Sequence, residues 1–576
     1  MRRSPSPPRR PLLIYDAACA FCVRAVARLA RRTGRRVDYR PLQSRRIRKR
    51  HRIPRGVAER ASQLVEPTGR IRSGAGAMLG ALRRAPGPHP WLRLFAFPVA
   101  RTVAEAVYRR IARHRRAASR LERHLLPPPH DPRWLVERAV GVAAFAAFYA
   151  LRPQLRGLYG QRGLQPVAEL LEAARAQLGP ARYRLLPTLL WLDDSDRRLD
   201  RLARSGELAA LALALDVHPR LAAATAWATY LSLVSAGRDF LSYQWDALLL
   251  EALPLVFLDA PDLAFRWLAA RLHFESGVAK LQSGDPTWRD GEALVVYHET
   301  APLPTGLGWW AHQLPRGYKR ALTPITLALE CAAPVLAFGP APARRLSFGL
   351  LAALQLGLAA TANYGFFNLL SLGLSAAILP PRIPRTRRPL WRRLVRWATA
   401  APLLLVSVTQ LLRRLRVLDT PPGRVEALAQ RLHPFRIVNH YGLFSVMTVT
   451  RPEIVIEGSN DGVSWLAYEL PSKPGDPARK PPRVAPLHPR LDWQLWFAAM
   501  AAPPRWFQRL VERLLAGEPE VLGLFAHNPF PEAPPRFIRA VHYQYRMTDR
   551  GTRKETGAWW HRERLGLYFP AVQLAV

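Results

Sequence analysis

Nine apolar runs separated by arginine-rich segments fill the middle of this 576-residue chain. They lie at residues 134–151, 207–215, 221–236, 247–258, 263–281, 322–338, 346–361, 364–379 and 397–412. Several approach the roughly 20 residues that an α-helix needs to cross a bilayer, and Trp and Tyr lie near their ends. A soluble protein with large buried helices is the alternative. The pattern favours a central α-helical transmembrane bundle of about nine spans.

The arginines between these runs predict an orientation. Cytoplasmic loops are enriched in Lys and Arg. Nine crossings with a cytoplasmic start place Arg344, Arg345 and the seven arginines of residues 380–396 in the cytoplasm. Residues 284–320 and everything after Leu412 then lie outside. Residues 1–10 are basic and Pro-rich, with no cleavable signal peptide after them. We therefore expect a multi-pass protein of the bacterial inner membrane, with the endoplasmic reticulum membrane as the alternative.

The N-terminal part has short strand and helix patterns instead of long apolar runs. Residues 12–16 predict a buried strand, residues 19–33 a helix with arginines on its outer face, and residues 36–41 a second strand. A Pro-Thr-Gly turn between residues 63–65 and 70–72 predicts a hairpin. After a basic tail of residues 1–10, we expect an α/β thioredoxin-like domain over residues 11–125.

Cys19 and Cys22 lie at the predicted turn from strand to helix. The partial positive charge of a helix N-terminus stabilises a thiolate at Cys19, which can attack a disulfide, and Cys22 can then resolve the mixed disulfide. Half of a zinc site and two ordinary buried thiols are the alternatives, but no second Cys/His pair has suitable spacing. The sequence favours a redox-active Cys19–Cys22 disulfide, with no cofactor or metal expected.

The C-terminal part predicts strands rather than long helices. Residues 452–457 alternate, residues 460–462 (Asn-Asp-Gly) predict a hairpin turn, and residues 464–469 and 537–547 are again strand-like. Residues 491–500 predict one helix with an aromatic face. We expect a membrane domain over residues 126–412, a linker over 413–433 and an extracytoplasmic, mostly-β domain over 434–576.

The net charge of +43 comes from 85 Lys and Arg against 42 Asp and Glu. The excess is steepest in the first 133 residues, which hold 33 basic and 7 acidic residues. Only six of the basic residues are lysines, which suggests an arginine preference in the genome as much as a binding surface. No helix-turn-helix, zinc-finger or RNP pattern is present, so we expect no nucleic-acid partner.

Charged and amide side chains lie within or beside two of the apolar runs: Gln244, Asp246, Glu251, Glu275 and Lys280. Ionisable groups at membrane depth face a partner or a cavity, because charge in hydrocarbon costs several kcal/mol. Helix–helix pairing, for instance of Glu251 with Lys280, is the first interpretation. The second is a polar cavity, open to the outside and capped by the loop that carries Asp285 and Trp288.

Two stretches carry family resemblances. Residues 15–22 (YDAACAFC) resemble the Asp-Gly-x-Cys-x-x-Cys signature of the DCC family of thiol-disulfide oxidoreductases, over residues 11–117 in all. Ala17 replaces the usual glycine, and Asp16 matches the signature's aspartate. The resemblance implies redox chemistry at Cys19 and Cys22, Asp16 in support, and a thiol–disulfide electron partner.

Residues 134–570 resemble the lipase maturation factor family in long, ordered blocks: 158–167, 240–251, 276–315, 363–370, 441–461 and 468–500. These blocks add Asn363 to the candidate polar residues. The resemblance implies a multi-pass membrane factor that helps secreted lipases to fold, with the lipid bilayer and an exported client such as a lipase as partners. In the predicted topology the cysteines lie across the membrane from such a client, so they would serve a membrane-bound or cytoplasmic partner.

Two alternatives remain open at this point. Gly277–Leu281 followed by Trp288 resembles the lysine-bearing segment of vitamin K-dependent carboxylases, which implies an acid–base role for Lys280 in a membrane enzyme. The other alternative is a structural membrane bundle with a degenerate redox domain.

Overall fold

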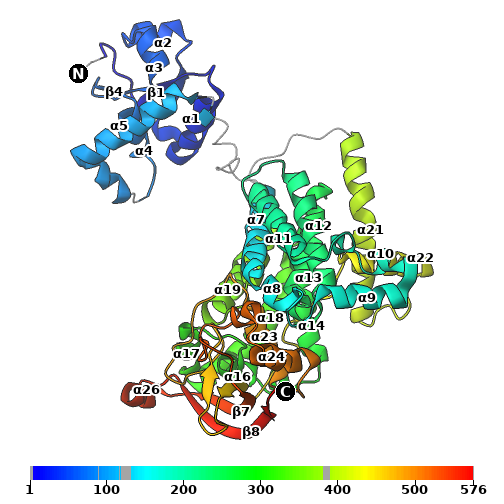
Figure 1. Cartoon of the computed structure of the whole chain (residues 1–576). Helices are drawn as coiled ribbons and strands as arrows, with labels where there is room; N and C mark the ends of the chain where they lie inside the picture. The colour runs from blue at the N-terminus through cyan, green and yellow to red at the C-terminus, as the bar shows by residue number, and fades with distance from the viewer. Residues whose placement is uncertain (1–3, 88–89, 116, 119–131, 381–389, 575–576) are drawn as a thin grey trace. The chain divides into compact units, whose positions relative to one another are not determined.

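A computed structural model describes residues 4–87, 90–115, 117–118, 132–380 and 390–574. The chain forms two compact units, Met1–His130 and Asp131–Val576, which are described separately (Figure 1).

The N-terminal unit is built on a four-stranded sheet of order β2-β1-β3-β4. Its strands are β1 (Leu12–Tyr15), β2 (Asp38–Pro41), β3 (Gln63–Val65) and β4 (Ile71–Ser73). β1 and β2 are parallel and are connected by helix α1 (Ala20–Thr33), whereas β3 is antiparallel to both β1 and β4. The expected α/β architecture of this region is therefore confirmed.

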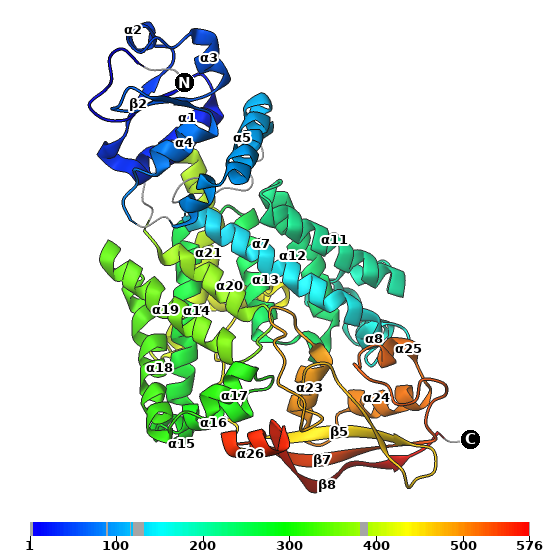
Figure 2. The ribbon, with the colours of Figure 1, turned by 90° about the vertical axis from the view of Figure 1, so that its left-hand side faces the viewer.

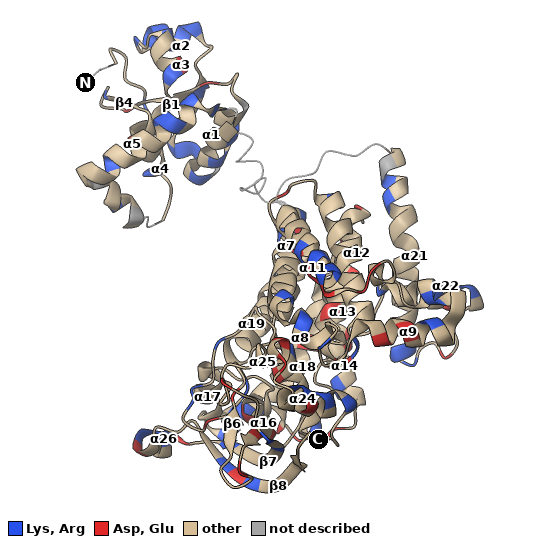
Figure 3. Ribbon diagram, viewed as in Figure 1, with Lys and Arg blue, Asp and Glu red and all other residues tan. Residues whose placement is uncertain are grey.

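Both faces of this small sheet are covered. Leu13 and Leu64 pack against Val26 and Leu29 of α1, and Ile14 and Val65 pack on the other face. The remaining helices are α2 (Arg45–Arg50), α3 (Arg55–Arg60), α4 (Ala75–Leu82), η2 (Pro90–Ala96) and α5 (Pro98–Arg113). Figure 3 shows Lys and Arg over α1, α2 and α3. The apolar stripe of α1 is buried at Val26 and Leu29, whereas Arg32 is exposed and Arg24 and Arg28 are half-buried.

Long helices run back and forth through the second unit (Figure 2). They are α7 (Pro132–Leu151), α11 (Asp196–Ala214), α12 (Pro219–Ala236), α13 (Gln244–Phe257), α14 (Asp262–Gln282), α18 (Arg316–Leu336), α19 (Ala341–Thr361), α20 (Phe367–Ser375) with η7 (Ala376–Ile378), and α21 (Leu390–Arg414). Shorter elements connect them: η3 (Arg152–Gln154), α8 (Leu155–Tyr159), α9 (Val167–Leu178), η4 (Gly179–Ala181), α10 (Arg182–Leu185), η5 (Leu189–Trp191), η6 (Arg238–Leu241) and α22 (Gly423–Leu432).

Among the described residues, two helical segments are long and apolar enough to cross a membrane: Pro132–Tyr159 and Arg393–Arg414. The prediction of about nine spans is therefore not confirmed. The other helices are shorter or carry charge. For example, α13 has 14 residues, about 21 Å at 1.5 Å per residue, and contains Asp246 and Glu251.

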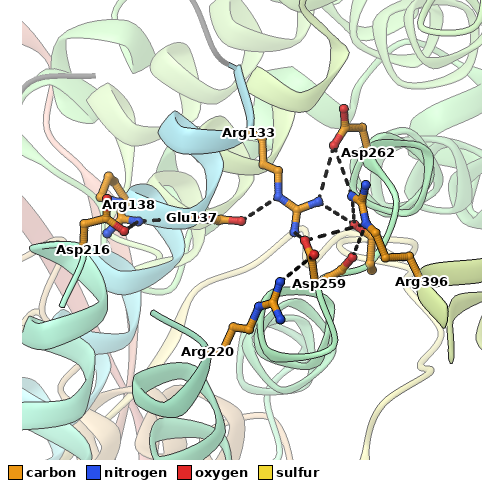
Figure 4. Close-up of polar contacts among 9 residues, drawn as sticks. Arg133, Glu137, Arg138, Asp216, Arg220, Asp259, Asp262 and Arg396 are labelled. Atoms are coloured by element: carbon orange, nitrogen blue, oxygen red, sulfur yellow. Dashed lines mark hydrogen bonds and ion pairs between the residues drawn. The ribbon is translucent and has the colours of Figure 1, made fainter. Parts of the chain in front are cut away.

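The helices of the bundle share a charged end. Figure 4 shows Arg133, at the start of α7, paired with Glu137 and Asp259 at 2.7 and 2.8 Å. Arg220, at the start of α12, also pairs with Asp259, and Arg396 of α21 donates to the backbone carbonyl of that residue. We call this end of the bundle the arginine end. The network joins the starts of α7, α12 and α21 to the turn between α13 and α14.

The opposite end of the bundle carries short helices and a sheet. Residues 284–320, predicted as a loop, contain α15 (Pro286–Arg289), α16 (Ala293–Thr300) and α17 (Gly306–His312), and α18 begins at Arg316. That prediction was wrong because helices of four to eight residues leave little periodic signal.

The C-terminal sheet has the order β6-β5-β7-β8 and is antiparallel. Its strands are β5 (Pro452–Ser459), β6 (Leu466–Tyr468), β7 (Phe537–Met547) and β8 (Trp560–Val572). Three strands and α23 (Arg490–Ala498) match the sequence expectation, whereas β8, α24 (Arg505–Leu515), α25 (Pro519–Leu522) and α26 (Arg550–Thr556) are additional. The core of the sheet is continuous with that of the helical bundle.

Candidate functional site

Cys19 is the N-cap of α1, and its Sγ accepts a hydrogen bond of 3.3 Å from the backbone N–H of Cys22. Both thiols are free and half-buried. β1 ends four residues before Cys19, so the pair lies at the strand-to-helix turn that the sequence predicts. The helix dipole and this hydrogen bond both favour negative charge on the Cys19 sulfur.

Asp16 organises the turn that precedes the cysteines. Its Oδ1 accepts hydrogen bonds from the backbone N–H of Ala18 at 3.0 Å and from Gln43 at 2.8 Å. Its Oδ2 pairs with Arg115 at 3.1 Å. Arg115 is 99 positions further along the chain. No local sequence signal could have placed it here.

Burial raises the pKa of the Cys22 thiol to about 12, and the hydrogen bond and charge of Cys19 act in the same direction. The nearby Arg115 guanidinium opposes this rise in the pKa. Cys22 therefore remains protonated at neutral pH. The arrangement suits an attacking role for Cys19 and a resolving role for Cys22, which would lose its proton as Cys19 becomes part of a mixed disulfide.

A second group of candidate residues surrounds Asn439–Met447, a segment without regular secondary structure that we call the strap. Backbone groups of an irregular buried segment need partners from side chains. Gln244 accepts a hydrogen bond from the backbone N–H of Gly442 at 2.9 Å, and Glu275 accepts one from Tyr441 at 2.8 Å. Lys280 donates to the carbonyl of Leu443 at 2.8 Å.

The remaining contacts continue along the strap. Glu251 accepts from the backbone N–H of Asn439 at 3.0 Å and from the Tyr441 hydroxyl at 2.7 Å. The Trp288 indole donates to the carbonyl of Phe444 at 3.2 Å, and Asp285 accepts from the N–H of Met447 at 2.6 Å. Four of the polar residues at the apolar runs therefore hold one segment of irregular backbone: Gln244, Glu251, Glu275 and Lys280.

The ion pairs differ from the predicted one. Glu251 pairs with Arg271, and Lys280 pairs with Glu330 at 2.8 Å. The expected pairing of Glu251 with Lys280 was wrong, because Arg271, nine residues or about two and a half helical turns before Lys280 on α14, is the cation that lies beside Glu251. Glu330 belongs to the adjacent helix α18. Sequence analysis did not single out either partner, although Arg271 and Glu330 lie inside the apolar runs 263–281 and 322–338 and so carry the same signal as Glu275 and Lys280.

Asp246 and Asn363 bind residues of the C-terminal part that come after the strap in the chain. Asp246 is fully buried and binds the Arg490 guanidinium through both oxygens, at 2.6 and 2.9 Å. The Tyr230 hydroxyl also donates to Asp246. Asn363 accepts from the backbone N–H groups of Val484 and Ala485 at 2.8 and 3.0 Å. These contacts tie the helices to the C-terminal sheet region.

A cavity of about 70 Å³ lies behind the strap. Lys280, Trp288 and Glu330 line it together with His273, Gln355, Tyr297, Tyr364 and a larger number of apolar side chains. The cavity is less polar than the one the sequence predicts, since the charges of Lys280 and Glu330 are paired with each other. Within the described part of the chain, no three His, Cys, Asp or Glu side chains are grouped so that they could hold a metal ion.

A groove of about 500 Å³ lies on the other side of the strap. It is lined by Asp239, Ser242, Tyr243, Gln244, Trp245, Leu443, Phe444, Ser445, Val446, Trp493, Gln494, Trp496 and Phe497. The indole N–H groups of Trp245 and Trp493 are buried without a hydrogen-bond acceptor. We call this feature the aromatic groove.

Comparison with known proteins identifies the relatives of this chain. Residues 131–383 match the lipase maturation factor transmembrane domain, residues 437–570 the lipase maturation factor C-terminal domain, and residues 13–121 a DCC1-like thiol-disulfide oxidoreductase. Lipase maturation factor 2 of Rattus norvegicus is 33% identical over 77% of this chain and 83% of its own length. This chain belongs to the lipase maturation factor family.

Other members of the family agree with this assignment. Lipase maturation factor 2 of Homo sapiens is 32% identical over 77% of this chain and 83% of its own length. Lipase maturation factor 1 of Bos taurus is 31% identical over 75% of this chain and 87% of its own length. No solved structure gives a significant match.

The strap and its partners lie within the regions that match the two lipase maturation factor domains. The carboxylase alternative is not supported, since these relatives are lipase maturation factors. The surroundings of Lys280 point the same way. Its ammonium group binds Glu330 and the Leu443 carbonyl, which are contacts that a structural cation makes.

Proposed function

We propose that this member of the lipase maturation factor family assists the folding of an exported, lipase-like client, and that the client contacts the aromatic groove. The observation that carries the proposal is the aromatic lining of the groove, which includes Trp245, Trp493 and Trp496.

The side chains that line the groove suit a protein partner. Aromatic residues are enriched at the centres of protein interfaces. Tyr243, Trp496 and Phe497 contribute rings to the groove, and Val446 of the strap is 65% exposed at its edge. A client chain that has not yet reached its final packing exposes apolar side chains that such a surface can cover.

We propose the bacterial inner membrane as the location, with the arginine end of the bundle in the cytoplasm. Lys and Arg favour the cytoplasmic side, and Arg344, Arg345, Arg393 and Arg396 all belong to this end. The groove belongs to the opposite end of the bundle. It would then face the compartment into which a client is exported.

The test compares two equivalent substitutions. Val446→Asp places a charge in the groove, whereas Val463→Asp places the same charge on a hairpin turn where the side chain is 82% exposed. In a strain that lacks the gene, we expect Val463→Asp to restore secreted lipase activity and Val446→Asp to restore at most about a tenth of it, at equal protein levels on immunoblots. Equal activity of the two variants would contradict a role for the groove.

A second activity is proposed for the N-terminal unit, because its cysteines have the geometry of an attacking and a resolving thiol. The Cys19 thiolate attacks one sulfur of a substrate disulfide, and the other sulfur leaves as a thiolate that takes up a proton. Cys22 then gives up its proton and attacks the Cys19 sulfur, which releases the second substrate thiol. The substrate disulfide is reduced to two thiols while Cys19 and Cys22 form a disulfide, and a thiol partner must reduce this disulfide for turnover.

Alkylation of the purified full chain tests these roles. At pH 7 we expect iodoacetamide to modify Cys19 at least about tenfold faster than Cys22, because burial keeps the Cys22 thiol protonated. Peptide mass spectrometry distinguishes the two sites. Faster modification of Cys22 would contradict this assignment of roles and would leave the proposal about the client groove unaffected.

A further inference from the structure

A narrow pocket opens at the arginine end of the bundle, between α7, α14, α19 and the end of η7. Arg133, Arg266 and Arg344 line it together with Asp262, Phe265 and Leu379. Its enclosed part of about 20 Å³ has room for one water-sized group, such as a phosphate oxygen. No step proposed for the client or for the cysteines uses this pocket.

The positive charges of the pocket are not all neutralised. Arg133 is paired with Glu137 and Asp259. Arg344 donates to the backbone carbonyls of Ile378 and Leu379, at 2.7 and 2.9 Å, and pairs with no carboxylate among the residues that the structure describes.

Arg266 has no ion pair within the same described ranges, and its buried Nε has no hydrogen-bond acceptor. Asp262, the carboxylate that lines the pocket, lies 3.4 Å from Arg133 and 3.9 Å from Arg396. It is thus shared by two other arginines. Arg266 and Arg344 therefore line this pocket with no carboxylate at ion-pair distance among the described residues, and guanidinium groups bind phosphate well.

The surroundings fit a lipid better than a free anion. Leu346, two residues after Arg344, and Phe338, at the end of α18, are large apolar side chains exposed on the surface of the bundle. Trp391 and Trp397 are exposed at the start of α21, where aromatic side chains commonly mark the membrane interface. A headgroup phosphate held by Arg266 and Arg344 would leave its acyl chains against this apolar surface.

We propose that the pocket between Arg266 and Arg344 binds the phosphate of an anionic membrane lipid. Basic pockets between transmembrane helices on the cytoplasmic side are suited to such headgroups. The bound phosphate supplies the anion that Arg266 lacks. It also joins the start of α14 to the start of α19, because Arg266 belongs to α14 and Arg344 to α19.

The experiment measures thermal unfolding of the purified full chain in neutral detergent micelles that contain increasing fractions of phosphatidylglycerol or phosphatidylcholine. Arg266→Gln is the test variant, because Arg266 makes no ion pair that its loss would break. Arg266→Lys keeps the charge. Arg345→Gln removes the same charge from an exposed position next to Arg344 and is the matched control.

We expect phosphatidylglycerol to raise the unfolding midpoint of the wild-type chain and of Arg345→Gln at similar lipid fractions. Arg266→Gln should need about tenfold more phosphatidylglycerol for the same shift, and Arg266→Lys an intermediate fraction. Equal effects of the two lipids on the wild-type chain, or equal responses of wild type and Arg266→Gln, would overturn the proposal. A full shift with millimolar inorganic phosphate alone would replace it with a site for a free anion.

Discussion

At the scale of single residues, a buried charged side chain of this protein pairs with a side chain of opposite charge on another helix. Lys280 pairs with Glu330 in the helical bundle, and both side chains are at least nine-tenths buried. A buried ion pair contributes little net stability when intact, but removing one partner leaves the other charge uncompensated at a cost of about 3–5 kcal/mol. Lys280 also binds the strap, so a structural role explains all of its contacts.

A double substitution separates a structural Lys280 from a catalytic one. We expect Lys280→Met to lower the unfolding midpoint strongly, and Lys280→Met combined with Glu330→Gln to recover part of the loss, because no unpaired carboxylate remains. Secreted lipase activity per folded molecule should equal that of the wild type in the double variant. Loss of activity at normal abundance would instead indicate that Lys280 takes part in chemistry.

The buried carboxyl group of Asp492 makes the stability of the protein depend on pH. It is buried on α23, and its Oδ1 accepts hydrogen bonds from the backbone N–H groups of Ser472 and Lys473 at 2.7 and 2.8 Å. Burial raises its pKa from 3.8 to about 6, although those hydrogen bonds oppose the rise. Between these two pH values the folded state binds more protons than the unfolded state, so the contribution of Asp492 to stability falls as pH rises.

The comparison variant is Asp492→Asn, which keeps an oxygen acceptor for both N–H groups and cannot ionise. We expect the free energy of unfolding of the wild type, relative to this variant, to decrease by about 2 kcal/mol between pH 4 and pH 6. Denaturant unfolding at a series of pH values measures the difference. A difference that does not change over this range would show that the carboxyl group has an ordinary pKa.

At the scale of elements, the strap explains why apolar helices carry polar side chains. A helix satisfies its own backbone, whereas Asn439–Met447 cannot, because it forms neither helix nor strand. α13 and α14 supply the partners through Gln244, Glu251, Glu275 and Lys280. The strap in turn separates the cavity from the aromatic groove, since Leu443 and Phe444 line both.

Glu251 is the central partner of the strap. Glu251→Gln would leave the buried Arg271 without its anion, so we expect a loss of about 3–5 kcal/mol in the free energy of unfolding. Glu426→Gln removes a partly exposed carboxylate that pairs with Arg413, and we expect a change below about 1 kcal/mol. Chemical denaturation in detergent compares the two variants. Similar losses would mean that the strap is not held through Glu251.

For the whole molecule, the two ends of the bundle differ in chemistry. One end carries the arginine network and the pocket proposed for a lipid phosphate, and the other carries the strap, the aromatic groove and the C-terminal sheet. Arg133, Arg220 and Arg396 bind the turn between α13 and α14 by ion pairs and hydrogen bonds. Such a charged network is compatible with a membrane interface but not with its apolar interior.

Reporter fusions test the proposed orientation. An alkaline phosphatase fused after Val576 should be active, because it would lie outside, whereas one fused after Arg123 should be inactive. A green fluorescent protein fused at the same two positions should give the reverse pattern. Activity of both phosphatase fusions, or of neither, would place both sites on one side and require an even number of crossings.

Much of the N-terminal unit follows from local pattern. The strand at Leu12–Tyr15, the helix that begins after Cys19 and the hairpin around the Pro67–Gly69 turn are encoded by neighbouring residues, and all three are present. In the C-terminal part the alternation of Phe537–Met547 also predicts its strand. β8 was missed because three consecutive charged residues, Arg562–Arg564, and then Gly566 and Pro570 interrupt its alternation.

The sequence by itself determined that Gln244, Asp246, Glu251, Glu275 and Lys280 need partners, because each polar side chain lies within or beside an apolar run. Only the tertiary structure decided what those partners are. The strap lies more than 150 residues from these helices along the chain, Arg490 lies 244 residues from Asp246, and Glu330 lies 50 residues from Lys280. Periodicity and spacing are properties of neighbouring residues, whereas the pairing of distant charges depends on which helices pack together.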